Sequence, residues 1–381
     1  MPPLYGQVVA GPPGAGKTTY CTGMQEYLRL LGRKAWVINL DPANEVPKKR
    51  PLPTTTSSDE TDESPKESNA LPYDTLLDVC DSVVNLSSVM KQLGLGPNGG
   101  LVYCMEYLEA HVSEVVEMIR ERVEEDYYLI FDLPGQVELY THGTAVPRLL
   151  QELVSVLDLR LVAIQLIDAH YCTEPTNFLS AALLGTTTML RLELPTVSVL
   201  SKIDLLPNYG PLPFSLDFFT ECQDLERLVP FLQGGTMNGN DEEDDYDDYR
   251  YDTSNNNNGF VEDYTEDEDY QKARRRTRSS PFFRKHEKLH RVLAEVVEDF
   301  GLLSFIPLDI SSAESVGRVV ARIDKCNGYI FLASQQNSNS QTHNLFEVAA
   351  KSEPSNYETI ADIQERLIDA KEYKRKEQSK T

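Results

Sequence analysis

Residues 11–18 read GPPGAGKT and match the pattern G-x-x-x-x-G-K-[ST] at every defined position. In this pattern the glycines let backbone N–H groups approach phosphate oxygens, and the lysine brings a positive charge to the β- and γ-phosphates. The hydroxyl of Thr18 suits Mg²⁺, which takes few protein ligands and keeps most of its waters. The spacing therefore predicts a nucleoside triphosphate site on the backbone of residues 14–19.

A second motif, Asp-Leu-Pro-Gly-Gln at 132–136, ends the apolar run YYLIFD. A carboxylate at the end of such a run can face the metal through water. Gly135 can offer its N–H to the γ-phosphate, and Gln136 can orient the attacking water. We therefore expect Thr18 and Asp132 at the metal and Gln136 at the water.

Two short motifs after later apolar runs point to the base of the nucleotide, S-K-I-D at 201–204 and S-S-A-E at 311–314. The carboxylate of Asp204 can accept hydrogen bonds from N1 and N2 of guanine, a donor pair that adenine lacks. The stem of Lys202 can pack over the base, and the N–H of Ala313 can meet guanine O6. S-K-x-D departs from the usual N-K-x-D, and each motif alone is weak. Their order after the phosphate loop predicts GTP rather than ATP. The residues expected to contact the nucleotide are Gly14, Ala15, Gly16, Lys17, Thr18, Thr19, Gly135, Ser201, Lys202, Ile203, Asp204 and Ala313.

Alternating apolar runs and helical patterns must position these motifs. Strands are expected at 4–10, 35–40, 127–132, 160–168, 195–200 and 303–308. Helices are expected at 17–31, 76–93, from a Gly-Pro-Asn-Gly-Gly turn at 96–100 to about 125, and at 175–192, 212–233, 282–300 and 314–326. This order predicts an α/β fold of three layers with a mainly parallel sheet. Ligands bind such sheets at the carboxyl ends of the strands, so the motifs should converge there.

One domain is expected over residues 1–334, with the helical segment 76–125 inside it. Residues 47–70 and 235–280 are polar, charged and poor in large apolar residues, and we interpret both as disordered inserts. The second insert carries an acidic run at 241–269 and a basic run at 272–278, which most simply balance each other as solvated chain. A docking site for a basic partner is the alternative for the acidic run, and a localisation signal is the alternative for the basic run.

A polar tail is expected from 335 to 381, with one amphipathic helix near 356–377. Ile360, Ile363, Leu367 and Ala370 share a face at helical spacing.

Composition limits the class of protein. The chain has 381 residues, 40% of them hydrophobic, which excludes a wholly disordered chain. A net charge of −24 argues against direct nucleic-acid binding. No apolar run approaches the roughly 18–20 residues that span a bilayer, and the N-terminus lacks the basic start of a signal peptide. Six scattered cysteines fit a reducing compartment, so we expect a cytoplasmic protein without a membrane partner.

The tripeptide Gly-Pro-Asn at 96–98 lies between the second and third expected strands. It resembles the signature of the GPN-loop GTPases, dimeric P-loop proteins of the signal-recognition-particle and MinD-like (SIMIBI) class. CMEYLEA and HYCTEP look most like the second of the three eukaryotic paralogues. The segments that carry the resemblance are GPPGAGKTTYC (11–21), NLDPANE (39–45), LGPNGGLVYCMEYLEA (95–110), DLPGQVEL (132–139), DAHYCTEPTNF (168–178) and LSKIDL (200–205).

The resemblance implies three further catalytic residues. Asp41 matches a switch I acid near the metal and the attacking water, and Glu138 matches a residue that holds this water. Asn98 matches a residue that reaches across a dimer to the partner's γ-phosphate, where an amide N–H₂ can donate to developing charge.

The resemblance also implies a cellular role and partners. The implied role is that of a switch between GTP-bound and GDP-bound forms. The implied partners are a second subunit, in a homodimer or in a heterodimer with another paralogue, and RNA polymerase subunits or assembly factors. The implied output is assembly and nuclear import of RNA polymerase II, with polymerase III as a further candidate and shuttling to the nucleus as part of the role.

Two other interpretations of the same residues stay open. An ATP-dependent kinase of a small substrate shares the phosphate loop, but it needs an arginine-rich lid, and the sequence shows no clear one. A non-catalytic assembly scaffold would hold GTP as a structural ligand and would carry the same motifs.

Overall fold

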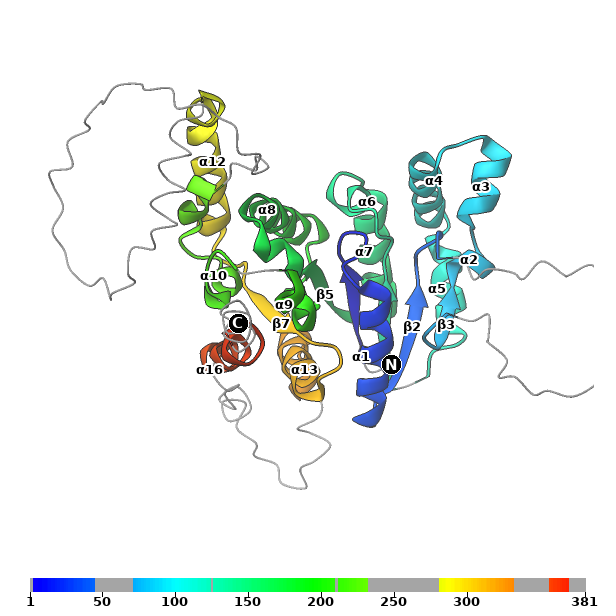
Figure 1. Cartoon of the computed structure of the whole chain (residues 1–381). Coiled ribbons are helices and arrows are strands. Elements are labelled where there is room, and N and C mark those ends of the chain that lie inside the picture. Colours follow the sequence, from blue (N-terminus) through cyan, green and yellow to red (C-terminus); the bar gives the residue numbers. More distant parts are fainter. Residues whose placement is uncertain are drawn as a thin grey trace, which may run out of the picture.

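The computed structural model describes residues 3–44, 71–124, 126–209, 212–231, 281–331 and 356–369 (Figure 1). The two inserts predicted at 47–70 and 235–280, and the first part of the predicted tail, lie outside these ranges.

Seven parallel strands form one sheet in the order β3-β2-β4-β1-β5-β6-β7. The predicted three-layer α/β fold is confirmed. In the register of the sheet, Val9 of β1 lies opposite Asp132 of β4, and Asp168 of β5 lies opposite Ser201 of β6. The C-terminal ends of these neighbouring strands therefore lie at the same height along the sheet, so the loops that follow them start side by side. The strands are β1 Leu4–Ala10, β2 Lys34–Asn39, β3 Thr75–Asp78, β4 Tyr127–Asp132, β5 Leu159–Asp168, β6 Thr196–Ser201 and β7 Phe305–Leu308.

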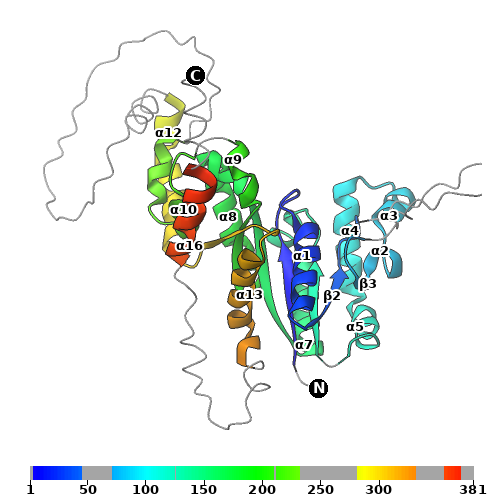
Figure 2. The same ribbon diagram turned by 60° about the horizontal axis from the view of Figure 1, so that its bottom comes forward.

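Helices cover both faces of the sheet because side chains alternate along each strand. Val8 faces one apolar cluster and Val9 the other. The cluster that contains Val9 packs under α1 (Lys17–Leu30) and α13 (Ala313–Asn327), which lie side by side on one face in Figure 2. On the opposite face, α4 (Pro97–Ala110), α5 (Val112–Arg120) and α7 (Ala145–Leu157) cover the cluster that contains Val8.

A third apolar cluster lies beside β6 and β7, under α8 (Pro175–Leu192) and α12 (Pro281–Phe300). The other short helices are α2 Val79–Ser82, α3 Leu86–Leu93, α6 Glu138–Thr141, η1 Ala169–Thr173, η2 Ile203–Leu205, α9 Leu206–Tyr209, α10 Leu216–Glu221 and η3 Leu225–Phe231.

The structure differs from the sequence interpretation in several places. The helix expected over 76–93 begins instead as the edge strand β3, because two leucines in a four-residue segment show no period that separates strand from helix. The glycine-rich segment 96–100 is no free turn: Pro97 starts α4, where a missing N–H costs nothing. The helix expected over 212–233 is two short helices, α10 and η3.

Helix α7 was not anticipated, although the sequence carries its signal. Val146, Leu149, Leu150, Leu153 and Leu157 recur at helical spacing and are all buried.

The C-terminal part of the chain packs on the domain. Helix α16 (Asn356–Ile363) continues as one π-helical segment, η4 (Gln364–Asp369). Ile360, Ile363 and Ile368 are buried in the third cluster. Of the helix predicted near 356–377, residues 370–377 lie outside the described ranges, and the boundary at 334 stays a prediction. Within the described residues, no helix combines the length and apolar character needed to cross a membrane.

Candidate nucleotide site

The loop between β1 and α1 has the backbone of a phosphate cradle. Gly14 and Gly16 have φ angles of +81° and +90°, a region that L side chains rarely adopt. A Cβ on Gly14 would meet nothing within 4 Å, so the loop is open there. At Gly11 a Cβ would lie 2.5 Å from the carbonyl oxygen of Leu166, so close packing on β5 requires glycine. The loop ends at the amino terminus of α1, where free N–H groups and the helix dipole favour anions.

Lys17 lies inside this loop. Its Nζ donates to the carbonyl oxygens of Gly11 (3.0 Å) and Pro12 (3.4 Å). Burial lowers the pKa of Lys17, and the charges of Asp132 and Asp41 oppose that shift. A Cβ on Gly135 would lie 3.2 Å from Lys17 Nζ. The fold therefore brings the Pro-Gly turn after β4 against the phosphate loop.

Asp132 is a buried carboxylate at the end of β4. Its Oδ2 accepts a hydrogen bond from the Tyr73 hydroxyl (2.9 Å), which in turn accepts one from Asn44 Nδ2 (3.3 Å). Its Oδ1 is buried and has no hydrogen-bond partner within the described part of the chain. Burial raises the pKa of Asp132 to about 6, against the hydrogen bond from Tyr73 and the charge of Lys17.

Asp41 follows β2, the neighbour of β4. Its Oδ1 accepts a hydrogen bond from the N–H of Ala43 (2.9 Å). Burial raises the pKa of Asp41, while that hydrogen bond and the nearby Lys17 lower it. The structure thus brings Lys17, Asp41 and Asp132 together from three separate strand ends.

These residues fit a magnesium ion. Mg²⁺ prefers oxygen ligands and binds through one or two protein groups, with substrate phosphates and waters supplying the rest. The buried Oδ1 of Asp132 is such a group, because an unpartnered buried oxygen costs free energy that a cation or its water would offset. Thr18 lies in the first turn of α1, beside Lys17.

The S-K-I-D loop is tied directly to the phosphate loop. Ser201 Oγ donates to the carbonyl oxygen of Ala15 (2.8 Å), and Lys202 Nζ donates to that of Gly14 (2.5 Å). Lys202 also pairs with the carboxylate of Asp168 at 2.7 Å. Ile203 is buried and Asp204 is exposed in η2. The aliphatic stem of Lys202 therefore extends from the S-K-I-D loop to the phosphate loop, and in this position it can pack against a bound base.

The loop that follows β7 is held by its own side chains. Ser312 Oγ accepts from the N–H of Ser315 (3.4 Å) and caps α13. Asp309 Oδ1 accepts from the N–H of Ser311 (2.9 Å). Ala313 is the first residue of α13, and β7 is the neighbour of β6, so its loop follows the strand next to the S-K-I-D loop.

The residues expected to position water differ in their surroundings. Gln136 is half-buried, and its Oε1 is buried with no hydrogen-bond partner within the described part of the chain. Glu138 is exposed at the start of α6. Helix α6 is joined to the phosphate loop, because the N–H of Gly11 donates to the Tyr140 hydroxyl (3.1 Å). Gln136 thus carries a buried acceptor atom without a partner among the described residues, whereas Glu138 is open to solvent.

Asn98 lies apart from this cluster. It is exposed in the first turn of α4, which packs with α3 beyond the β2 side of the sheet (Figure 1). A Cβ on Gly100 would lie 2.7 Å from Leu86 of α3, so the two helices approach closely there. In the described ranges no hydrogen bond joins Asn98 to the phosphate loop of its own chain. Its predicted role in a partner's site stays a prediction.

Three groups at the site were not anticipated from the sequence: Tyr73, Tyr140 and Asp168. Asp168 is the last residue of an expected strand and the first residue of a segment that carries the family resemblance. Its place at the carboxyl end of a strand could therefore have indicated a residue of the site. Tyr73 and Tyr140 belong to no motif, and only the folded contacts reveal them.

Comparisons with protein-family models and with curated proteins both find relatives of this chain. A family model described as a conserved hypothetical ATP-binding protein matches residues 9–52 and 67–329. "GPN-loop GTPase QQT1" of Arabidopsis thaliana is 37% identical and the match covers 97% of this chain and 99% of that protein. "GPN-loop GTPase 2" of Danio rerio is 38% identical, with 96% and 93% covered, and its Saccharomyces cerevisiae namesake is 34% identical, with 99% and 88% covered.

Among solved structures, an apo-form GTPase from Pyrococcus abyssi matches with a TM-score of 0.49 and 17% identity, over 85% of this chain and 97% of that one. The gap between the two matched ranges of the family model falls within the predicted insert 47–70. The names of the relatives confirm the resemblance to the second eukaryotic paralogue that CMEYLEA and HYCTEP suggested. At 34–38% identity over nearly its whole length, the chain belongs to the GPN-loop GTPase family.

Proposed function

We propose that this chain binds GTP and hydrolyses it to GDP and phosphate. The observation that carries the proposal is the junction at the carboxyl edge of the sheet. There Lys17 lies close enough to Asp41 and Asp132 for both carboxylates to act on its charge, and Lys202 spans from the phosphate loop to Asp168. The part around Lys17 suits the phosphates of a nucleotide, and the part around Lys202 suits its base. The names of the relatives support guanine as that base.

In the proposed reaction a water attacks the γ-phosphorus, the bond to the β–γ bridging oxygen breaks, and GDP leaves. Backbone N–H groups of residues 14–19 and Lys17 hold the phosphates, and Lys17 exchanges its carbonyl partners for phosphate oxygens. The amide of Gln136 orients the water, with Asp41 and Glu138 as further acceptors. The water's protons end on the phosphate product. Thr18, and Asp132 through water, would hold a Mg²⁺ ion, which would supply charge that neutralises the phosphates.

We further propose that the chain works as a dimer, with itself or with another GPN-loop GTPase, and switches between GTP and GDP forms. The exposed position of Asn98 leaves its side chain available to a second subunit. The output we propose is assembly and nuclear import of RNA polymerase II, with polymerase III as an extension, from the cytoplasm and with shuttling to the nucleus. This step rests on the family resemblance, and the net charge of −24 fits a basic protein partner.

Phosphate release by the purified chain tests the proposal. GTP with Mg²⁺ should give turnover, alone or with another family member added, and ATP at the same concentration should give little. Equal turnover with ATP would overturn the guanine assignment. Tight GTP binding without phosphate release under any pairing would instead support the scaffold interpretation.

Asp204→Asn is expected to weaken GTP binding by ~1–3 kcal/mol, the scale of a hydrogen bond to a charged group. Asp204 is exposed, so its carboxylate is free to meet the base edge, and an asparagine would accept only one of the two guanine donors. Xanthine nucleotide should regain affinity, because its C2 oxygen can accept from the amide. Calorimetry with both nucleotides measures this effect.

Asp158→Asn is the matched control for this prediction. Asp158 is also exposed, but it precedes β5 and so lies at the opposite edge of the sheet. Its replacement should leave both affinities unchanged. Unchanged GTP affinity in Asp204→Asn would place base recognition elsewhere.

A further inference from the structure

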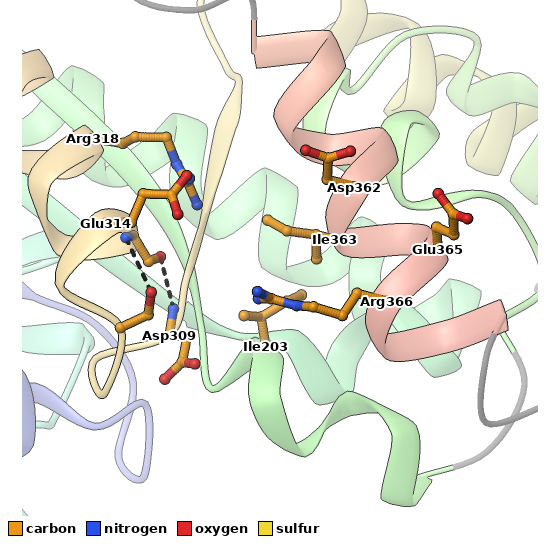
Figure 3. A pocket seen from close by; sticks show the side chains of 10 residues that line it. Ile203, Asp309, Glu314, Arg318, Asp362, Ile363, Glu365 and Arg366 are labelled. Carbon is orange, nitrogen blue, oxygen red and sulfur yellow. Dashed lines mark hydrogen bonds and ion pairs between the residues drawn. The ribbon is translucent and has the colours of Figure 1, made fainter.

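A cavity of about 530 Å³ separates the C-terminal segment from the two loops assigned to the base (Figure 3). Ile203, Ser312, Glu314 and Arg318 line it on the side of the domain, and Asp362 and Arg366 line it on the side of the segment α16–η4. Figure 3 shows Arg366 extending over Ile203 toward α13. Ile203 sits between Lys202 and Asp204, and Ser312 and Glu314 flank Ala313. The C-terminal segment therefore faces both base loops across the same cavity.

The segment is anchored by buried apolar side chains and one backbone contact. Ile360, Ile363 and Ile368 belong to the same buried cluster as Ile203. The Oε1 of Gln364 accepts a hydrogen bond from the N–H of Leu216 at the start of α10 (3.0 Å). These contacts bring a segment at the end of the sequence onto the loop that carries Asp204.

Charges around the cavity oppose phosphate binding there. Glu314 and Arg318 form an ion pair at 3.1 Å within α13. Burial lowers the pKa of Arg318, Glu314 raises it, and the facing charge of Arg366 lowers it further. Two further carboxylates, Asp309 and Glu365, lie on the lining, so acids outnumber arginines. The cavity is thus a polar space behind the base loops and distinct from the phosphate cradle.

We propose that the C-terminal segment 356–369 is a positioning element for guanine recognition, which holds the S-K-I-D and S-S-A-E loops at the spacing that the base requires and slows nucleotide release. The inference rests on the proposed function. Its physical basis is preorganisation: loops already ordered by packing lose less entropy when a ligand binds. By linkage, bound guanine nucleotide stabilises the docked segment by the same factor.

Ile363→Ala in the full chain tests the proposal. Removing this buried side chain loosens the segment from the cluster that contains Ile203. Release of a fluorescent GDP analogue should become about tenfold faster, within the usual range for coupled sites. Affinity for inorganic tripolyphosphate should change much less, because the phosphates contact residues 14–19 and not the base loops themselves.

Ile119→Ala is the matched control. Ile119 is fully buried in α5, in the cluster on the opposite face of the sheet. Its loss should lower the melting temperature but leave the GTP-to-tripolyphosphate affinity ratio as in the unmodified chain. Where Ile363→Ala fails to fold, Gln364→Leu removes the acceptor for Leu216 without opening an apolar hole. Gln364→Glu keeps an acceptor oxygen and should restore normal release.

The outcomes separate this proposal from the one on which it rests. An unmodified chain with no preference for GTP over ATP would overturn the proposed function. A chain that prefers GTP but whose GDP release and affinity ratio are unaffected by both Ile363→Ala and Gln364→Leu would overturn the positioning role alone. Hydrogen exchange gives an independent reading: GTP should slow amide exchange in residues 356–369, and unchanged exchange there would contradict the linkage.

Discussion

Asp132→Asn is expected to slow GTP turnover by ~10²–10³-fold, the usual loss when one preorganised electrostatic group is removed. The carboxylate is buried, accepts a hydrogen bond from Tyr73 and feels the charge of Lys17. Its Oδ1 has no hydrogen-bond partner among the residues that the structure describes, so we expect this oxygen to face the metal or its water. An amide keeps the volume and an acceptor for Tyr73, but it lacks the charge. Single-turnover phosphate release measures the effect, with Asp158→Asn as a control that should keep normal turnover.

The same substitution should make the nucleotide-free protein more stable at pH 7. Burial raises the pKa of Asp132 from 3.8 to about 6, so the folded chain holds this proton more tightly than the unfolded chain. The stability that this group contributes is therefore complete below about pH 4 and is lost as the pH rises to about 6. At pH 7 the ionised side chain costs on the order of 1–3 kcal/mol, which an uncharged amide avoids.

Part of this gain will be offset, because Lys17 loses one of its two neighbouring carboxylates. Urea unfolding at pH 7.5 and pH 5 measures the balance, and the advantage of the variant should shrink at the lower pH. An equal advantage at both values would show that the buried charge is not its cause. Full turnover in the variant would remove Asp132 from the reaction.

Asn98→Ala is expected to slow turnover by a similar factor, ~10²–10³, while GTP affinity stays nearly unchanged. The phosphates are held by residues 14–19, and Asn98 is exposed on α4 without a hydrogen bond to that loop in the described part of the chain. Its effect should therefore arise in the partner's site. Gln92→Ala removes an exposed amide from the neighbouring helix α3 and should keep normal turnover.

Mixing variants separates action in the partner from action in the same chain. Asn98→Ala combined with Lys17→Ala should regain activity, because one site of the mixed dimer pairs an intact phosphate loop with an intact Asn98. Single-turnover assays of each variant and of the mixture provide the measurement. Full activity in Asn98→Ala alone would contradict the role, and no recovery in a verified mixed dimer would limit Asn98 to its own subunit.

The sequence by itself determined six of the seven strands and the phosphate loop, because the necessary information is local. A phosphate loop is a run of eight consecutive residues that joins a strand to a helix, and its glycines and lysine suffice to predict its chemistry. The helix expected at 175–192 has those limits in the structure, since Pro175 starts it and its apolar residues keep helical spacing. Once the strands were expected to be parallel, the carboxyl edge had to collect Asp41, Asp132, Lys202 and Ala313.

Only the tertiary structure decided which side chains meet there. Tyr73 joins Asp132, Tyr140 joins Gly11, Lys202 joins Asp168, and α16 packs beside Ile203, each across a long stretch of sequence. Nothing in the neighbouring residues encodes such pairs, because they depend on strand order and on which face each side chain takes. The edge strand β3 was missed for the same reason: its four residues become a strand only because β2 offers them a row of backbone partners.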